Sequence, residues 1–197
     1  IPKNCMLNPK YPAAVVAGNV ETSQHLVNAL LSALDVMSSS QGTMNNLTFG
    51  NKKYQYYETI CSGSPAGPDF HGTNAIQVHM TNSRLTDPEI LELKFPVILK
   101  DFHIKRNSGG KGIFNGGDGT YREILFKEDM ELAILSSHRK IKPHGLRGGE
   151  NGKLGKNYII KKNKRKEILQ GCDYRKVKKG DSIVIETPTP GGYGKRK

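Results

Sequence analysis

Several features that would indicate particular classes of protein are rare or missing in this sequence. The 197 residues include three cysteines, Cys5, Cys61 and Cys172, which show neither metal-ligand spacing nor the pattern of a disulfide framework. No apolar run approaches the roughly 20 residues that a membrane-spanning helix needs. The first residues show no charged segment followed by an apolar one, so we expect no signal peptide. With a mean hydropathy of −0.55, these absences favour a soluble protein of the reducing cytoplasm that does not bind membranes.

Short sequence motifs of cofactor sites are missing as well. The chain contains neither a GxxxxGK pattern followed by Ser or Thr nor a GxGxxG pattern, so nothing in it indicates a nucleotide site. It also lacks HxxD, HExxH and any cluster of Cys and His residues. We therefore expect no metal site in this chain.

The net charge of +12 is unevenly distributed. Residues 1–99 carry six Lys and Arg against seven Asp and Glu, whereas residues 100–197 carry 24 against 11. The densest run, KKNKRK at residues 161–166, would suit a nucleic-acid partner. It has no interleaved aromatic residues and no recognisable reader motif. We favour a charged hairpin turn, with nucleic-acid binding as a less favoured alternative.

One stretch, from Gly18 to Asn46, organises the rest of the chain. Apolar residues with helical spacing predict an amphipathic helix with one buried stripe, which consists of Leu26, Val27, Leu30, Leu31, Leu34 and Met37. Asn19 or Thr22 is positioned to cap the first turn, where the helix dipole also favours the charge of Glu21. Small polar residues at 38–42 predict the end of the helix.

The remaining pattern indicates mainly β-structure. A hairpin is predicted over residues 48–60 with its turn at 50–53, followed by a loop over residues 61–73 and a strand over residues 75–85. A short buried strand is expected at residues 13–17. Further strands are predicted at residues 92–95, 97–104, 121–126, 130–135, 158–160, 167–169 and 182–186.

These elements predict an α+β fold. One amphipathic helix with a hairpin and loop region is followed by a β-rich meander, which forms a sandwich or a distorted barrel. We assign residues 1–90 to a helix-containing segment that bears the site and residues 91–197 to a β-rich carboxy-terminal segment. The glycine-rich turns are expected to serve mainly backbone conformations with positive φ.

Polar residues gather at both ends of the predicted helix and on the predicted strand at 75–85. Composition alone does not decide whether the amides and hydroxyls beside the helix are caps and turns or contacts to a ligand. On the strand, His79 could donate a proton, bind a metal or be a buried structural histidine. Arg84 could hold a carboxylate or phosphate, or could pair with Asp87 or Glu89.

An ordered set of strings resembles a known family. The strings are GNVETSQ at residues 18–24, SQGTMNN at 40–46, YYETI at 56–60, HMTNSRLTDPE at 79–89, SGGKG at 108–112, GGDG at 116–119 and ETPTPGGYG at 186–194. Together they resemble the hydantoinase B family, which includes the B half of ATP-dependent 5-oxoprolinase and the B subunits of N-methylhydantoinases. The resemblance covers essentially the whole chain but matches the carboxy-terminal portion of a longer B subunit, so we expect a piece of such a subunit.

The resemblance implies ATP-dependent opening of 5-oxoproline or a hydantoin ring. Two partners are expected: an A subunit, on which ATP is used, and the amino-terminal part of the B subunit. A divalent metal is expected in that amino-terminal part. The resemblance implies a substrate-binding wall, for which the best candidates are Glu21, Thr22, Asn45, Asn46, His79, Asn82 and Arg84. We assign no general base, and His71, His138 and His144 receive no role. The alternative is a catalytically inactive fragment or interaction module of the same fold.

Overall fold

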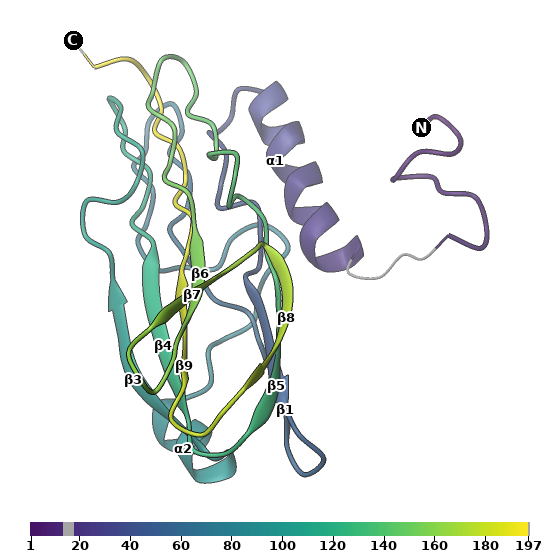
Figure 1. Ribbon diagram of the computed structural model, residues 1–197. Helices are drawn as coiled ribbons and strands as arrows, with labels where there is room; N and C mark the ends of the chain where they lie inside the picture. The colour runs from purple at the N-terminus through teal and green to yellow at the C-terminus, as the bar shows by residue number, and fades with distance from the viewer. Residues whose placement is uncertain (14–17, 197) are drawn as a thin grey trace.

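Two antiparallel β-sheets form the body of the protein in a computed structural model that describes residues 1–13 and 18–196. They pack as a sandwich, with helix α2 (Pro88–Lys94) at one end and long loops and the C-terminus at the other (Figure 1). The four-stranded sheet has the order β2-β1-β5-β8, with β1 (Asn46–Gly50), β2 (Gln55–Glu58), β5 (Met130–Leu135) and β8 (Cys172–Val177). The five-stranded sheet has the order β3-β4-β9-β6-β7, with β3 (Val97–Ile104), β4 (Thr120–Phe126), β6 (Lys156–Ile160), β7 (Lys166–Leu169) and β9 (Ser182–Glu186).

The predicted α+β fold is confirmed as a sandwich, and within the described residues the sheets do not close into a barrel. The predicted hairpin over residues 48–60 is the antiparallel pair of β1 and β2. The basic run at 161–166 joins the paired strands β6 and β7, as expected. The expected boundary at residue 90 does not separate the sheets, because the four-stranded sheet takes β1 and β2 from one side of it and β5 and β8 from the other.

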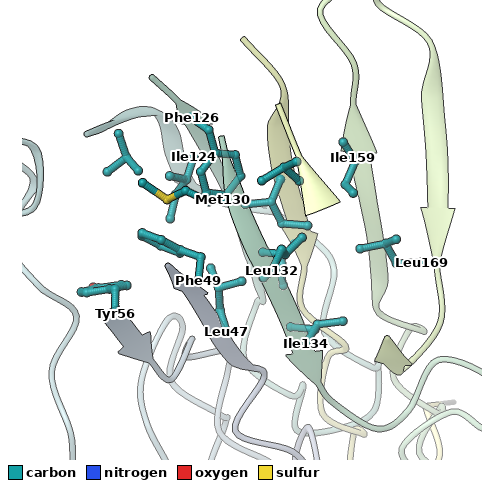
Figure 2. Close-up of a cluster of buried hydrophobic side chains, with 14 of the residues drawn as sticks. Leu47, Phe49, Tyr56, Ile124, Phe126, Met130, Leu132, Ile134, Ile159 and Leu169 are labelled. Atoms are coloured by element: carbon teal, nitrogen blue, oxygen red, sulfur yellow. The ribbon is translucent and has the colours of Figure 1, made fainter. Parts of the chain in front are cut away.

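Apolar side chains from both sheets fill the space between them (Figure 2). Alternate residues of β4 are buried, so Ile124 and Phe126 face inward, as expected for a strand with one face in the core. The rings of Phe49 and Phe126 meet edge-on with their centroids 5.4 Å apart. Leu91 of α2 is fully buried and belongs to the same core. Among the described residues, the core cluster includes none from helix α1 (Ser23–Ala33).

A buried ion pair connects the two sheets beside this core. Arg122 on β4 donates from Nε and Nη2 to the Glu58 carboxylate on β2 at 2.8 and 2.9 Å, and each side chain is 2% exposed. Tyr56 donates its hydroxyl to the same carboxylate at 2.9 Å. Burial, together with the negative charge of Glu58, raises the pKa of Tyr56 to about 12. The inward row of β4 is therefore apolar at Phe126 and charged at Arg122.

The strand predicted at residues 92–95 is wrong, because these residues belong to α2 or follow it directly. Asp87 caps the helix by accepting from the backbone N–H of Glu89 at 2.9 Å, and Pro88 occupies the first helical position. The sequence contained both signals, but the short apolar run was interpreted as β-structure.

The strand predicted at residues 75–85 is also wrong. The segment is irregular, with an isolated bridge between Ile76 and Ser62. Ala75 and His79 have positive φ values of 48° and 56°, which a regular strand does not permit. The alternation of polar and apolar residues therefore does not correspond to the two faces of a sheet.

Helix α1 is shorter than predicted, and the predicted apolar stripe is not its buried face. It ends at Ala33 and is preceded by a π-helical turn, Gly18–Thr22. Its buried residues are polar, with Gln24 1% and Asn28 6% exposed, whereas Leu26 and Leu30 are 44% and 54% exposed. Of the expected buried stripe, Leu26, Leu30 and Leu34 are exposed, whereas Val27, Leu31 and Met37 are partly buried. The helix lies beside the sheets with residues 1–13 beyond it (Figure 1).

Two further predictions concern the start of the chain and one edge strand. The strand expected at residues 13–17 falls, apart from Ala13, outside the described residues. Strand β8, at the edge of the four-stranded sheet, was not predicted. In the part of the chain that the structure describes, no helix combines the length and apolar character required to cross a bilayer.

The glycine-rich loops pack against one another at the end opposite α2. A Cβ atom on Gly63 would lie 2.2 Å from the carbonyl carbon of Gly117, so these backbones can approach only without side chains. The glycines of residues 108–119 are not among those with positive φ. Close backbone approach, rather than the expected positive φ, therefore explains their use.

The ion pair between Glu58 and Arg122 predicts a large effect on stability. Glu58→Gln leaves the buried Arg122 charge unpaired, so we expect the free energy of unfolding to fall by about 3–5 kcal/mol in urea titrations. The double variant Glu58→Leu with Arg122→Met removes both charges and should be more stable than Glu58→Gln alone. As a control, Asp129→Asn breaks the exposed pair with Lys178 and should cost less than about 1 kcal/mol. A cost for Glu58→Gln similar to that of the control would contradict the assignment.

Candidate functional site

The carboxylate of Glu21 joins the turn before α1 to the segment that leads into β1. Its Oε1 accepts from Thr43 Oγ1 at 2.8 Å, from the Met44 backbone N–H at 3.1 Å and from Asn46 Nδ2 at 2.8 Å. Its Oε2 is buried and has no hydrogen-bond partner among the described residues. Glu21 and Asn46, both predicted as site residues, are therefore in direct contact.

The amides of Asn45 and Asn46 are used inside the protein. Asn46 donates to the Leu135 carbonyl at 2.9 Å and accepts from the Tyr57 hydroxyl at 2.6 Å. Asn45 donates to Gln41 Oε1 at 2.7 Å and to the Ile60 carbonyl at 3.0 Å, and it accepts from Arg139 at 2.9 Å. Both amides hold the segment before β1 in position.

Thr22 does not form the predicted cap. It precedes α1 with helical backbone angles, φ −63° and ψ −40°, and its side chain makes no capping hydrogen bond. Asn19 does not cap the helix through its side chain either, and its carbonyl instead accepts from Ser23 Oγ at 2.6 Å. The π-helical turn continues into α1, so the chain has no extended residue at the position where a cap would act.

His79 binds the polar face of α1. Its Nε2 lies 2.8 Å from Asn28 Oδ1, which also accepts from the Ser40 backbone N–H at 2.9 Å. Because Asn28 Oδ1 is an acceptor, His79 carries its proton on Nε2. Burial lowers the pKa of His79, so the ring is neutral near pH 7. Gln24, one turn earlier on α1, donates to Thr81 Oγ1 and fixes the same irregular segment.

Asn82 and Arg84 lie on the wall of a cleft of about 270 Å³. The opposite wall comes from the turn before α1 and from the ends of β2 and of the segment before β1, with Asn19, Val20, Met44, Tyr57 and Glu58. Both predicted residues are exposed, and within the described part of the chain neither side chain makes a hydrogen bond or an ion pair. Of the two alternatives for Arg84, the pairing with Asp87 or Glu89 is not formed among the described residues.

The predicted site residues thus fall into separate groups. Asn82 and Arg84 share the small cleft, Glu21 and Asn46 lie beside it in one hydrogen-bond network, and Asn45 and His79 are held elsewhere by Arg139 and Asn28. Thr22 joins none of these groups. Thr22, Asn45 and His79 line neither the small cleft nor the larger cavity between α1 and the segment 136–146.

A larger cavity of about 830 Å³ lies between α1 and the segment 136–146. Its lining includes three histidines and a half-buried arginine, none of which was predicted as a site residue: His25, His138, His144 and Arg139. His25, Ala29 and Ser32 follow one another at helical spacing and all line this cavity, so this face of α1 was detectable in the sequence. The contribution of Arg139, far along the chain, had no local signal.

Hydrogen bonds fix the protonation states around this cavity. His138 Nδ1 donates to the Ile141 carbonyl at 2.7 Å, and burial lowers the pKa of His138 to about 4, so the ring is neutral near pH 7. Ser137 Oγ donates to the Gly42 carbonyl at 2.7 Å and lies 3.1 Å from His25 Nε2. The serine proton is therefore committed to a carbonyl, and His25 is the donor in the pair. This arrangement does not activate Ser137 as a nucleophile.

Gly42 packs beside the rings of His25 and His138, whose centroids lie 5.3 Å apart. It has a positive φ of 61°, and a Cβ atom there would lie 2.4 Å from His138 Nε2. A side chain at this position is excluded by both the backbone conformation and the neighbouring ring.

The described residues contain no set of three His, Cys, Asp or Glu side chains placed to hold a metal ion. The protein groups around the two cavities instead offer hydrogen bonding and positive charge.

Comparison with known proteins connects these features to one family. The family model described as hydantoinase B/oxoprolinase matches residues 1–196. The 5-oxoprolinase of Dictyostelium discoideum is 47% identical over 196 residues, which are 100% of this chain and 16% of that protein. The 5-oxoprolinase 1 of Arabidopsis thaliana is 48% identical over 194 residues, which are 98% of this chain and 15% of that protein.

A solved structure supports the same fold. The crystal structure of an ATP-dependent caprolactamase from Pseudomonas jessenii matches with a TM-score of 0.71 at 21% sequence identity, covering 85% of this chain and 32% of that chain. At this identity the likeness concerns the fold. The chain spans about a sixth of the length of the curated relatives it matches. With a family match across residues 1–196, the chain belongs to the hydantoinase B/oxoprolinase family.

Proposed function

We propose that this chain is the carboxy-terminal part of an ATP-dependent cyclic-amide hydrolase that opens 5-oxoproline or a hydantoin ring. In the proposed reaction, ATP is used on a partner A subunit to activate the amide oxygen, and the B component hydrolyses the activated ring. The observation that carries the proposal is the family match over residues 1–196, together with relatives that are 5-oxoprolinases.

The cleft beside Arg84 is the part of this chain that we assign to the substrate. Its volume of about 270 Å³ suits a small ring, and Arg84 and Asn82 have no internal hydrogen-bond partner among the described residues. The Glu58 carboxylate in the same wall is already neutralised by Arg122 at 2.8 Å. Arg84 therefore supplies an uncompensated positive charge that attracts a carboxylate or an activated, negatively charged amide oxygen.

The role of these residues is positioning. An unstrained cyclic amide is a poor electrophile, so its activation must precede attack by water, and the ring must be held while that occurs. Asn82 can donate an amide hydrogen and Arg84 a planar pair of hydrogens to the substrate. Glu21 and Asn46 support the facing wall through their mutual hydrogen bond. We assign no general base within this chain.

The exposed apolar face of α1 is the part of this chain that we expect to contact another protein component. Leu26 and Leu30 are 44% and 54% exposed on a helix whose polar face is turned inward, and residues 1–13 beside it are mostly exposed. Relatives are about six times longer than the matched region. We assign this face to contact with the amino-terminal part of a B-type subunit, since apolar helix faces in water are usually covered.

Reconstitution tests the proposed activity. We expect this chain, combined with the A subunit and the amino-terminal part of the B subunit, to release ADP and open 5-oxoproline or a hydantoin. Arg84→Ala should lower kcat/KM about 10- to 100-fold, the effect of losing one charge-assisted hydrogen bond of about 1.5–3 kcal/mol.

The matched control is Arg165→Ala, which removes the same charge from the β6–β7 turn and should leave kcat/KM unchanged. No ring opening by a well-folded reconstituted complex would favour the non-catalytic interaction module. Equal losses for both variants would remove Arg84 from the site.

The orientation of α1 makes a separate prediction. Leu26→Gln with Leu30→Gln should leave the free energy of unfolding of this chain within about 0.5–1 kcal/mol, because both side chains are exposed. The same variant should abolish co-purification with the amino-terminal part of the B subunit expressed as a separate chain.

Asn28→Ala serves as the contrasting variant. It leaves the Ser40 N–H and His79 without their acceptor and should lower the free energy of unfolding by about 1–3 kcal/mol. The assignment fails when the leucine variant unfolds more easily than Asn28→Ala.

A further inference from the structure

The cavity of about 830 Å³ carries positive charge that no lining residue neutralises. Its lining contains Arg139, Lys140 and three histidines, but no Asp or Glu. It shares no lining residue with the cleft beside Arg84. It is therefore a second site, and binding there does not require the proposed ring-opening activity.

Arg139 is the less exposed of the two basic residues, since it is half-buried and Lys140 is exposed. Its guanidinium donates to neutral oxygens, those of Ser137 at 2.7 Å, Asn45 at 2.9 Å and Asn157 at 2.6 Å. Its Nε is buried without a hydrogen-bond partner, and among the described residues no carboxylate forms an ion pair with it. Burial lowers the pKa of Arg139 to about 10, and the Glu21 carboxylate opposes this effect only in part.

A guanidinium that is shielded from water and has no ion-pair partner lowers the stability of the folded chain. A buried ion is normally paired with an opposite charge, since its desolvation is otherwise uncompensated. The Glu21 carboxylate acts on Arg139 without forming an ion pair with it among the described residues, and it offsets the effect of burial only in part. A negatively charged ligand in the cavity would supply the direct partner that Arg139 lacks.

The remaining walls indicate the rest of that molecule. Ala29, Ile141 and Leu146 provide apolar surface, and Ser32, Ser39 and Ser137 provide hydroxyl groups. The volume lies within the range of small-molecule sites, about 300–1,000 Å³. Apolar walls beside a planar guanidinium suit a carboxylate on a hydrocarbon body better than a bare inorganic anion.

We propose that this cavity binds a small organic carboxylate, with its charge against Arg139 and Lys140 and its hydrocarbon part against Ile141 and Leu146. The cavity is partly open to solvent, so the ligand can enter without unfolding the sandwich. Neutral His138 contributes its ring to the wall rather than a second charge.

Histidine-ring NMR on the full 197-residue chain tests the proposal, since three of its six histidines line the cavity. We expect saturable shifts of His25, His138 and His144 with 5-oxoproline, glutamate or acetate at constant ionic strength, with a dissociation constant of about 1 mM or below. His103, exposed on β3, should not shift. Inorganic phosphate and chloride are titrated in parallel arms. Shifts with phosphate alone, or equal shifts with chloride, would overturn the carboxylate assignment.

Three variants connect the binding to the cavity. Arg139→Gln should weaken binding about 10- to 100-fold and Lys140→Gln about 2- to 5-fold, whereas Lys164→Gln, on the β6–β7 turn, should change it less than about 2-fold. Because Arg139 also bonds Asn45 and Asn157, its variant could lose structure. Ala29→Trp instead fills the cavity from the exposed side of α1 and should abolish binding while the chain stays folded. Unchanged binding in Ala29→Trp, or no saturable shift with any carboxylate, would overturn the proposal.

Discussion

Polar side chains, rather than an apolar stripe, hold helix α1 to the sandwich, and both cavities depend on this. Asn28 Oδ1 accepts from Ser40 and His79, and Gln24 donates to Thr81. These contacts fix both the segment before β1 and the irregular segment 78–84 against the polar face of the helix. The turn before α1 walls the small cleft, and the middle of α1 walls the large cavity. Without these polar contacts, each cavity would lose the wall that α1 or the turn before it provides.

The sandwich and helix α1 are therefore stabilised by different interactions. The sandwich buries a continuous apolar core without any contribution from α1 among the described residues, and apolar burial is the dominant stabilising effect in folding. A typical net contribution of one internal hydrogen bond is about 1 kcal/mol, and only a few such bonds hold α1. The helix thus belongs to the less stable part of the molecule, the part from which ligand-binding elements are drawn. Covering its apolar face would add the burial that the isolated chain lacks.

The sequence predicted elements well where local pattern and environment agree. Strands such as β4 and β5 alternate clearly and were found, because one of their faces meets the core. Periodicity identifies a stripe on a helix but not what covers it, so the stripe of Leu26 and Leu30 was assigned to the wrong side. Strand β8 was missed because it is an edge strand in which charged residues such as Asp173 and Arg175 obscure the alternation. Of the predicted site residues, Asn82 and Arg84 lie on one cleft, as their closeness in sequence favours, whereas Arg139 reaches Asn45 across 94 positions and had no local signal.

The position of α1 would connect the two proposed binding events, that of a carboxylate in the large cavity and that of a protein partner on the apolar face. The carboxylate that we propose for the large cavity would contact the face with His25 and Ala29, and the protein partner that we propose would contact the face with Leu26 and Leu30. Because the helix is held by a few polar contacts, its placement is easier to change than that of a core strand. If the proposed ligand prefers one placement of α1, it changes the affinity for the proposed partner, and the partner changes the affinity for the ligand by the same factor. Both proposed binding events would then depend on how the polar face of α1 is held.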